Sequence, residues 1–167
     1  MYRWLAKVIV VIDFQDIKSM INEDDVPDIE AAEQLSRCVL SSKYVRAATS
    51  SDLTVGRVKA GAFIPHPYDD LSVNRHKSST IEEVWRLCTQ VASQTQKTLH
   101  GRAEVPAESF FSQGLVVKPD PIRRDNRQGL PSNPNHAIVV SWPAEKSAQL
   151  MLAQNIADSC RFFTTGG

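Results

Sequence analysis

The chain lacks net charge, a long apolar run and any internal repeat, and each absence excludes a class of protein. Its 19 basic and 19 acidic side chains balance, so no overall positive field favours nucleic acid or an anionic membrane. The aliphatic run at residues 8–12 is too short to span a bilayer or to form a signal peptide. The sequence therefore predicts a soluble protein that is neither a coiled coil nor a solenoid.

Cysteine is also scarce. Cys38, Cys88 and Cys160 are odd in number and widely spaced, and each falls on the apolar stripe of a predicted helix. Thiols in such positions behave as small hydrophobic side chains. We therefore expect three reduced cysteines and a cytoplasmic protein.

What the chain does contain is the composition of a globular domain. It has 167 residues, of which 42% are apolar and 23% charged, enough to bury a core without a metal or disulfides. We expect a single α+β domain over residues 1–167, in which about three helices pack on one face of a small mixed or antiparallel sheet. An exposed, proline-rich loop is expected at residues 119–135.

Hydrophobic periodicity and turn residues predict the individual elements. Thr80 and Glu83 have the spacing of a helix capping box, in which side chain and backbone satisfy each other's donors. Predicted helices cover residues 27–41, 80–92 and 143–163. Predicted strands cover residues 8–12, 59–65, 71–75, 102–105, 114–118 and 137–140.

Polar residues are concentrated at residues 63–76, directly after a predicted strand, where functional loops tend to lie. His66, Asp70 and His76 offer the nitrogen and oxygen ligands that a catalytic zinc needs. The alternative, which we favour, is that the acids and histidines of this stretch make turn hydrogen bonds or are solvated. We therefore predict neither a metal nor another cofactor.

The segment 71–75 alternates apolar and polar residues, which places Leu71 and Val73 inward on a short strand. Ser72 and Asn74 then share the opposite face. Arg75 suits bidentate binding of a phosphate or carboxylate. A structural hydrogen-bond network with backbone carbonyls is an equally good interpretation of these three polar residues.

His136 precedes the apolar strand 137–140, a position that suits either a general base or a loop anchor. Our main hypothesis is a small accessory or ligand-recognition protein, a subunit of a larger assembly, that binds a protein partner or a small anion. The residues expected to converge on one polar surface are Ser72, Asn74, Arg75, Arg102 and His136. The alternative is an enzyme acting on a nucleotide or phosphodiester, with His136 or His76 as acid or base, and Arg75 and Arg102 holding the anion.

Two further features carry weaker hypotheses. Residues 118–127 contain Arg123, Arg124 and Arg127, which suit contact with nucleic-acid phosphates, although acids dilute them and no aromatic pair is interleaved. The terminal Gly166-Gly167 would suit conjugation, but a frayed terminus is the better interpretation. We expect no membrane contact.

Several short motifs occur together in this sequence. They are Phe-Ile-Pro at 63–65, Leu-Ser-Val-x-Arg at 71–75, Gly-Arg-Ala at 101–103, and Asn-His-Ala leading into Trp-Pro at 135–143. In this combination the chain resembles short uncharacterised bacterial proteins. The resemblance implies a bacterial cytosolic origin and brings no activity with it.

Overall fold

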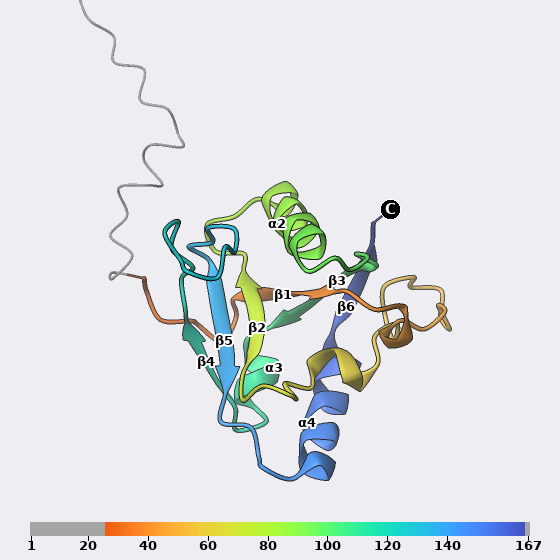
Figure 1. Cartoon of the computed structure of the whole chain (residues 1–167). Coiled ribbons are helices and arrows are strands. Elements are labelled where there is room, and N and C mark those ends of the chain that lie inside the picture. The colour runs from red at the N-terminus through yellow and green to blue at the C-terminus, as the bar shows by residue number, and fades with distance from the viewer. Residues whose placement is uncertain (1–25, 166–167) are drawn as a thin grey trace, which may run out of the picture.

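The computed structural model describes residues 26–165, whose strands form one sheet in the order β4-β5-β2-β1-β3-β6 (Figure 1). Every neighbouring pair is antiparallel, which confirms the predicted α+β class. The strands are β1 (Gln34–Val39), β2 (Leu71–Arg75), β3 (Gly101–Pro106), β4 (Val116–Pro119), β5 (His136–Val140) and β6 (Arg161–Thr164). The helical elements are η1 (Ser42–Tyr44), η2 (Ala60–Phe63), α2 (Ile81–Gln94), α3 (Glu108–Phe111) and α4 (Lys146–Ser159).

Helices cover both faces of this sheet, not one face as expected. Leu35 and Val39 of β1 point to the face where η2, α3 and α4 contribute to the main apolar core. Ser36 and Cys38 alternate to the other face, where Cys38 is bonded to α2. Figure 1 shows α2 above β1 and α4 below it. We call these the core face and the α2 face.

The core face is apolar because the strands that build it alternate. Leu71 and Val73 of β2 are each 1% exposed, as predicted from their spacing, and Ser72 between them is exposed. Phe63 of η2 meets Phe110 of α3 edge to face, with ring centroids 6.4 Å apart. Burying such side chains stabilises the fold by roughly 1.5–3 kcal/mol each.

The predicted helix over residues 27–41 is wrong, because this part of the chain contains strand β1. Its apolar residues fit a helical stripe, but Leu35 and Val39, four residues apart, also fall on one face of a strand. Pairing with β2 on one side and β3 on the other supplies the backbone hydrogen bonds. Tertiary pairing thus overrides a local helical pattern.

Two other boundaries differ from the prediction. The terminal helix begins at Lys146 and ends at Ser159, and Cys160 leads into strand β6 instead of extending the helical stripe to Phe163. The expected strand at 59–65 is the 3₁₀ turn η2, packed against α4. Residues 8–12 and Gly166-Gly167 lie outside the described residues.

The expectation of three reduced cysteines on helical stripes is also wrong. Cys38 lies on strand β1 and forms a disulfide with Cys88 of α2, 50 residues further along the chain. Cys160 is the remaining thiol and is buried. The disulfide ties α2 to the central strand of the sheet.

The capping box and four of the predicted strands are confirmed. Helix α2 has the capping box: the Thr80 hydroxyl accepts from the Glu83 backbone N–H at 3.2 Å, and the Glu83 carboxylate accepts from the Thr80 N–H at 2.8 Å. Strand β2 has the predicted bounds, and β3, β4 and β5 lie where strands were expected, with ends shifted by one or two residues. Residues 120–135 form a loop closed by one bridge between Ile122 and Asn133.

Candidate functional site

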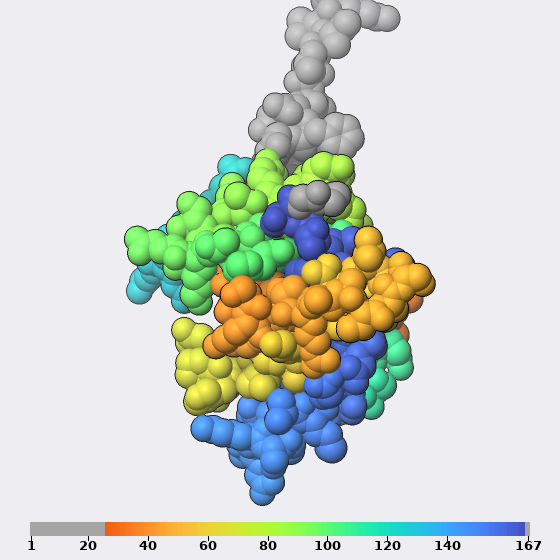
Figure 2. Space-filling view, turned by 90° about the vertical axis from the view of Figure 1, so that its right-hand side faces the viewer, coloured from red at the N-terminus to blue at the C-terminus, as the bar shows by residue number. Residues whose placement is uncertain are grey.

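Strands β1 and β2 pair over only two positions, Leu35 with Arg75 and Ser36 with Asn74. Strand β1 follows β3 along its whole length, so β2 diverges from β1 beyond Ser36 (Figure 1). The divergence leaves a cleft of about 570 Å³. Figure 2 shows it as a notch at the left edge, between α2 in green and the segment before β2 in yellow.

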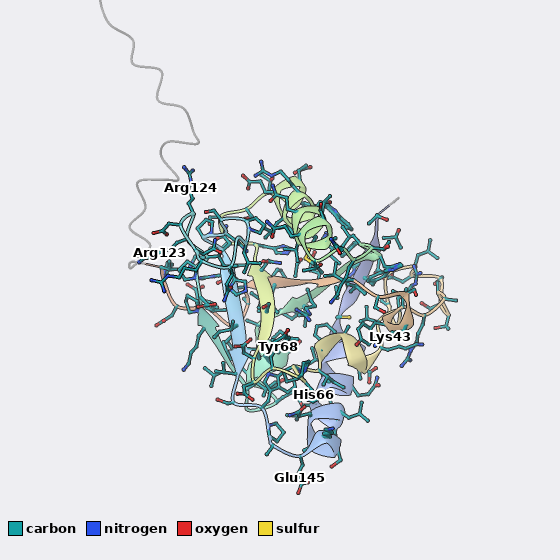
Figure 3. The ribbon with its side chains drawn as sticks, in the orientation of Figure 1. Lys43, His66, Tyr68, Arg123, Arg124 and Glu145 are labelled. Atoms are coloured by element: carbon teal, nitrogen blue, oxygen red, sulfur yellow. A yellow bond between two sulfur atoms is a disulfide. The ribbon has the colours of Figure 1, made fainter. Side chains whose placement is uncertain are left out.

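Three groups of elements wall this cleft. Helix α2 and the segment that follows it form one wall, and the loop 120–135 forms a second. The third consists of η1, η2 and the segment leading into β2. On this last wall Lys43 lies at the η1 side, whereas His66 and Tyr68 lie nearer to β2 (Figure 3).

Three of the five residues expected to converge on one polar surface line the cleft: Ser72, Asn74 and His136. Asn74 and His136 are register partners on β2 and β5. The Asn74 amide donates to Cys38 Sγ at 3.6 Å and its Oδ1 accepts from Asn133 Nδ2 at 2.8 Å. These contacts fix the orientation of Asn74 and hold the loop 120–135 against the sheet.

The imidazole of His136 is fixed by Asp120. Its Nδ1 lies 2.7 Å from the Asp120 carbonyl oxygen and 3.1 Å from the carboxylate Oδ2. A carbonyl oxygen only accepts, so Nδ1 carries the hydrogen. In the neutral ring Nε2 is then an acceptor, and it has no hydrogen-bond partner among residues 26–165.

Arg75 lies outside the cleft and has a structural role. It is 2% exposed, its Nε and Nη2 bind the two oxygens of Glu33 at 2.6 and 2.9 Å, and its Nη1 donates to the Pro27 carbonyl at 2.7 Å. The Asp28 carbonyl accepts from Nη2 at 3.3 Å. Arg75 therefore attaches the segment before β1 to the sheet.

Arg102 also lies away from the cleft, beneath α2. Its guanidinium contacts the ring faces of Trp85 and Phe163, with centroid distances of 5.3 and 4.5 Å, and it is paired with Glu104. Its Nη1 also donates to Ser36 Oγ at 3.3 Å. The residue is 4% exposed, so it packs α2 onto the sheet and is not accessible to a ligand.

His76 contacts Ser36, a residue that the sequence did not single out. The His76 Nε2 lies 2.6 Å from Ser36 Oγ. Burial lowers the pKa of His76, Arg102 adds to that shift, and Glu104 and Glu33 oppose it. Ser36 is fully buried, so its hydroxyl is not accessible to a substrate, whereas His76 is partly exposed.

The alternative metal site is not assembled. No group of three His, Cys, Asp or Glu side chains within residues 26–165 is arranged to hold a metal ion. His66, Asp70 and His76 therefore do not form the alternative site. Arg123 and Arg124 project from the loop at the upper left of Figure 3, far from Lys43 on the opposite side of the molecule. These two arginines are therefore separate from the cleft-lining Lys43 of η1.

Four functional candidates were missed from the sequence. Arg37, Lys43 and Lys97 line the cleft as cations, and Asn133 lines it as a buried amide. Arg37 would have stood out if residues 34–39 had been predicted as a strand. Its neighbours in sequence carry no motif. Its access to the cleft depends on the divergence of β2 from β1, which the sequence does not show.

No helix within residues 26–165 is long and apolar enough to cross a membrane. Comparisons of the chain with protein-family models, with curated proteins and with solved structures find no match.

Proposed function

We propose that this chain is a ligand-recognition protein, acting as an accessory subunit of a larger assembly, and that the cleft between β1 and β2 is its binding site. The observation that carries the proposal is the convergence of Ser72, Asn74 and His136 on one cleft of about 570 Å³. This volume lies within the roughly 300–1,000 Å³ typical of small-molecule sites.

Rigidity of the polar groups supports this proposal. Asn74 is held by Asn133 and Cys38, and His136 is held by Asp120, before any ligand arrives. A site whose side chains are already ordered loses less conformational entropy on binding. The buried position of Ser36 favours recognition over catalysis, because its contact with His76 is closed to substrates.

A cleft-blocking variant tests the proposal. Ser72 is exposed on β2 and lines the cleft, so Ser72→Trp fills the cleft without changing the core face. A fragment library screened by amide NMR shifts should perturb residues of β1, β2 and α2 in the native chain. The same shifts should be lost in Ser72→Trp.

The matched control is Thr164→Trp, which places the same ring at an exposed strand position of β6 outside the cleft. It should keep the native response. Fragment shifts that cluster elsewhere, or that persist unchanged in Ser72→Trp, would show that the cleft is not the binding site.

Catalysis on a nucleotide or phosphodiester is a second candidate, favoured by one observation. The Nε2 of His136, which has no hydrogen-bond partner in the described part of the chain, belongs to a cleft-lining ring whose other nitrogen is fixed by Asp120, as in a general base. Nucleotides and bis(4-nitrophenyl) phosphate should then be hydrolysed, with a loss of about 10²-fold or more in His136→Gln. Absence of turnover above buffer, or full activity in His136→Gln, rules this candidate out.

The cytoplasmic location predicted from cysteine spacing is now opposed by the disulfide. Disulfides persist in oxidising compartments and are rare in cytosolic proteins. The Cys38–Cys88 bond therefore supports a location outside the reducing cytoplasm. Fractionation of the native host, with the protein followed by antibody, distinguishes the two locations.

A further inference from the structure

We infer that the ligand of this cleft is an organic anion, in which a carboxylate or phosphate is attached to an apolar body. The inference rests on the proposed function and adds the chemical class of the ligand. It follows from the charges that line the cleft, from the Arg37 guanidinium, which has no carboxylate partner within residues 26–165, and from the apolar walls.

The charged side chains that line the cleft are of one sign. Arg37, Lys43 and Lys97 contribute cations, His66 and His136 contribute imidazoles, and no Asp or Glu of the described residues is among the lining groups. The whole chain has equal numbers of acids and bases, so this bias is local. A concave site lined by one sign of charge concentrates ligands of the opposite sign.

Arg37 lies at the floor of the cleft, where the β1–β2 ladder stops. Its Nε donates to the Ala62 carbonyl at 3.2 Å and its Nη1 to the Ser72 carbonyl at 2.9 Å. Burial lowers its pKa to about 10, and Tyr44 partly opposes the shift. The guanidinium is therefore charged at neutral pH, and both of its acceptors are neutral.

The other two arginines on the central strands are neutralised. Arg75 of β2 is paired with Glu33, and Arg102 of β3 with Glu104. Arg37 of β1 forms no ion pair within residues 26–165, and its Nη2 makes no hydrogen bond there. A partly buried charge without a counter-ion is costly, and an anion in the cleft would supply one.

The second half of the ligand is indicated by the apolar walls. Leu87 and Val91 lie one turn apart on α2, and Ile122 and Leu130 lie on the loop 120–135. All four are partly exposed, and none belongs to the main core cluster. An inorganic ion would leave this surface in water, whereas an aliphatic or aromatic body would cover it.

Matched probes test the charge and the body separately. We would titrate the full chain with 4-phenylbutyrate, phenyl phosphate, 4-phenylbutanol, 4-phenylbutylamine and inorganic phosphate, by calorimetry and amide NMR. The two organic anions should bind in the cleft at least about tenfold more tightly than the alcohol or the amine, since a charge-assisted contact adds that much affinity. Inorganic phosphate alone should bind more weakly than phenyl phosphate.

Arg37→Gln should weaken anion binding about tenfold and leave the alcohol unaffected. Arg57→Gln is the matched control, because Arg57 is also half-buried and held by two carbonyls but lies outside the cleft. If Arg37→Gln fails to fold, a double variant of exposed residues takes its place, Lys43→Gln with Lys97→Gln. This double variant should also weaken anion binding.

The outcomes separate the two proposals. Alcohol binding in the cleft as tightly as the anions, with loss in Ser72→Trp, overturns the anionic class and leaves the binding site standing. Preference for the amine overturns the class as well. If none of the five probes reaches the cleft, the anion inference is overturned, and the proposed function falls with it only if the fragment library also leaves the cleft empty.

Discussion

The ion pair between Arg75 and Glu33 is buried on both sides, with side-chain exposures of 2% and 6%. Removing one partner of such a pair leaves the other charge uncompensated away from water. Arg75 also satisfies the Pro27 and Asp28 carbonyls. Arg75 therefore stabilises the fold and does not serve a ligand.

We predict that Arg75→Ala lowers the free energy of unfolding by about 3–5 kcal/mol, measured by urea denaturation. The exposed pair of Lys77 with Glu30 is the control, and Lys77→Ala should cost at most about 1 kcal/mol. The double variant Arg75→Met with Glu33→Leu should recover much of the loss, because no charge is then left unpaired. Equal small effects for Arg75→Ala and Lys77→Ala would contradict the structural role.

His76 gives a second prediction at this scale, on pH. Burial is the main cause that holds its folded pKa below the usual 6.5. The unfolded chain therefore binds the proton first as pH falls. The contribution of neutral His76 to the free energy of unfolding is complete above about pH 6.5 and is lost as the pH falls below that value.

Urea midpoints should accordingly fall from pH 7.5 to pH 5.5, and His76→Gln should reduce this fall while keeping a partner for Ser36. The exposed His66 provides the control variant, His66→Gln, which should retain the native pH dependence. A pH dependence that is unchanged in His76→Gln would show that another group is responsible.

At the scale of elements, α2 is attached to the sheet by the Cys38–Cys88 disulfide and by the stacking of Arg102 between Trp85 and Phe163. Leu87 of the cleft wall is the neighbour of Cys88 in the helix. The disulfide thus fixes one wall of the cleft relative to its floor. Loosening the bond should affect both stability and the shape of the cleft.

Thiol labelling tests this attachment. The native protein should not react with iodoacetamide, because burial raises the pKa of the free Cys160 thiol to about 12. After unfolding without reductant one cysteine should be labelled, and after reduction all three. Reduction should lower stability by about 2–4 kcal/mol.

Labelling of three cysteines without reductant would contradict the disulfide. Cys38→Ser with Cys88→Ser should reproduce the loss of stability seen on reduction. Cys160→Ala should leave the reductant effect intact, which makes it the control.

At the scale of the whole molecule, the cleft lies where the two halves of the sheet separate. One half contains β4, β5 and β2, and the other contains β1, β3 and β6. A ligand in the cleft would contact both halves, α2 and the loop 120–135. Binding should therefore stabilise the entire fold and not one local element.

A ligand present at 100 times its Kd should raise the free energy of unfolding by about 2.7 kcal/mol. The measurement is the shift in Tm, and in hydrogen exchange the protection should rise in β1 and β2 together. Ser72→Trp should abolish the shift, and Thr164→Trp should retain it. Protection confined to one half of the sheet would contradict binding across the divergence.

Local signals in the sequence were sufficient for several elements. The capping box of Thr80 and Glu83 depends on atoms three residues apart, and the alternation in residues 71–75 depends on neighbours. The strand at residues 34–39 was not predicted, because the apolar spacing there suits a helix and only pairing with β2 and β3 makes the segment a strand. The convergence of Ser72, Asn74 and His136 was expected from residue type and position, but the cleft that they line depends on the divergence of β2 from β1.

The sequence by itself determined the α+β class, the capped helix and the alternation that separates the two faces of β2, because these depend on interactions between residues close in the chain. Tertiary structure decided the disulfide and the divergence of β2 from β1. It also decided which arginines are neutralised: Arg75 and Arg102 meet carboxylates, whereas among residues 26–165 Arg37 meets only carbonyl groups. The physical reason is that charge compensation depends on distances in space, and local periodicity contains no information about those distances.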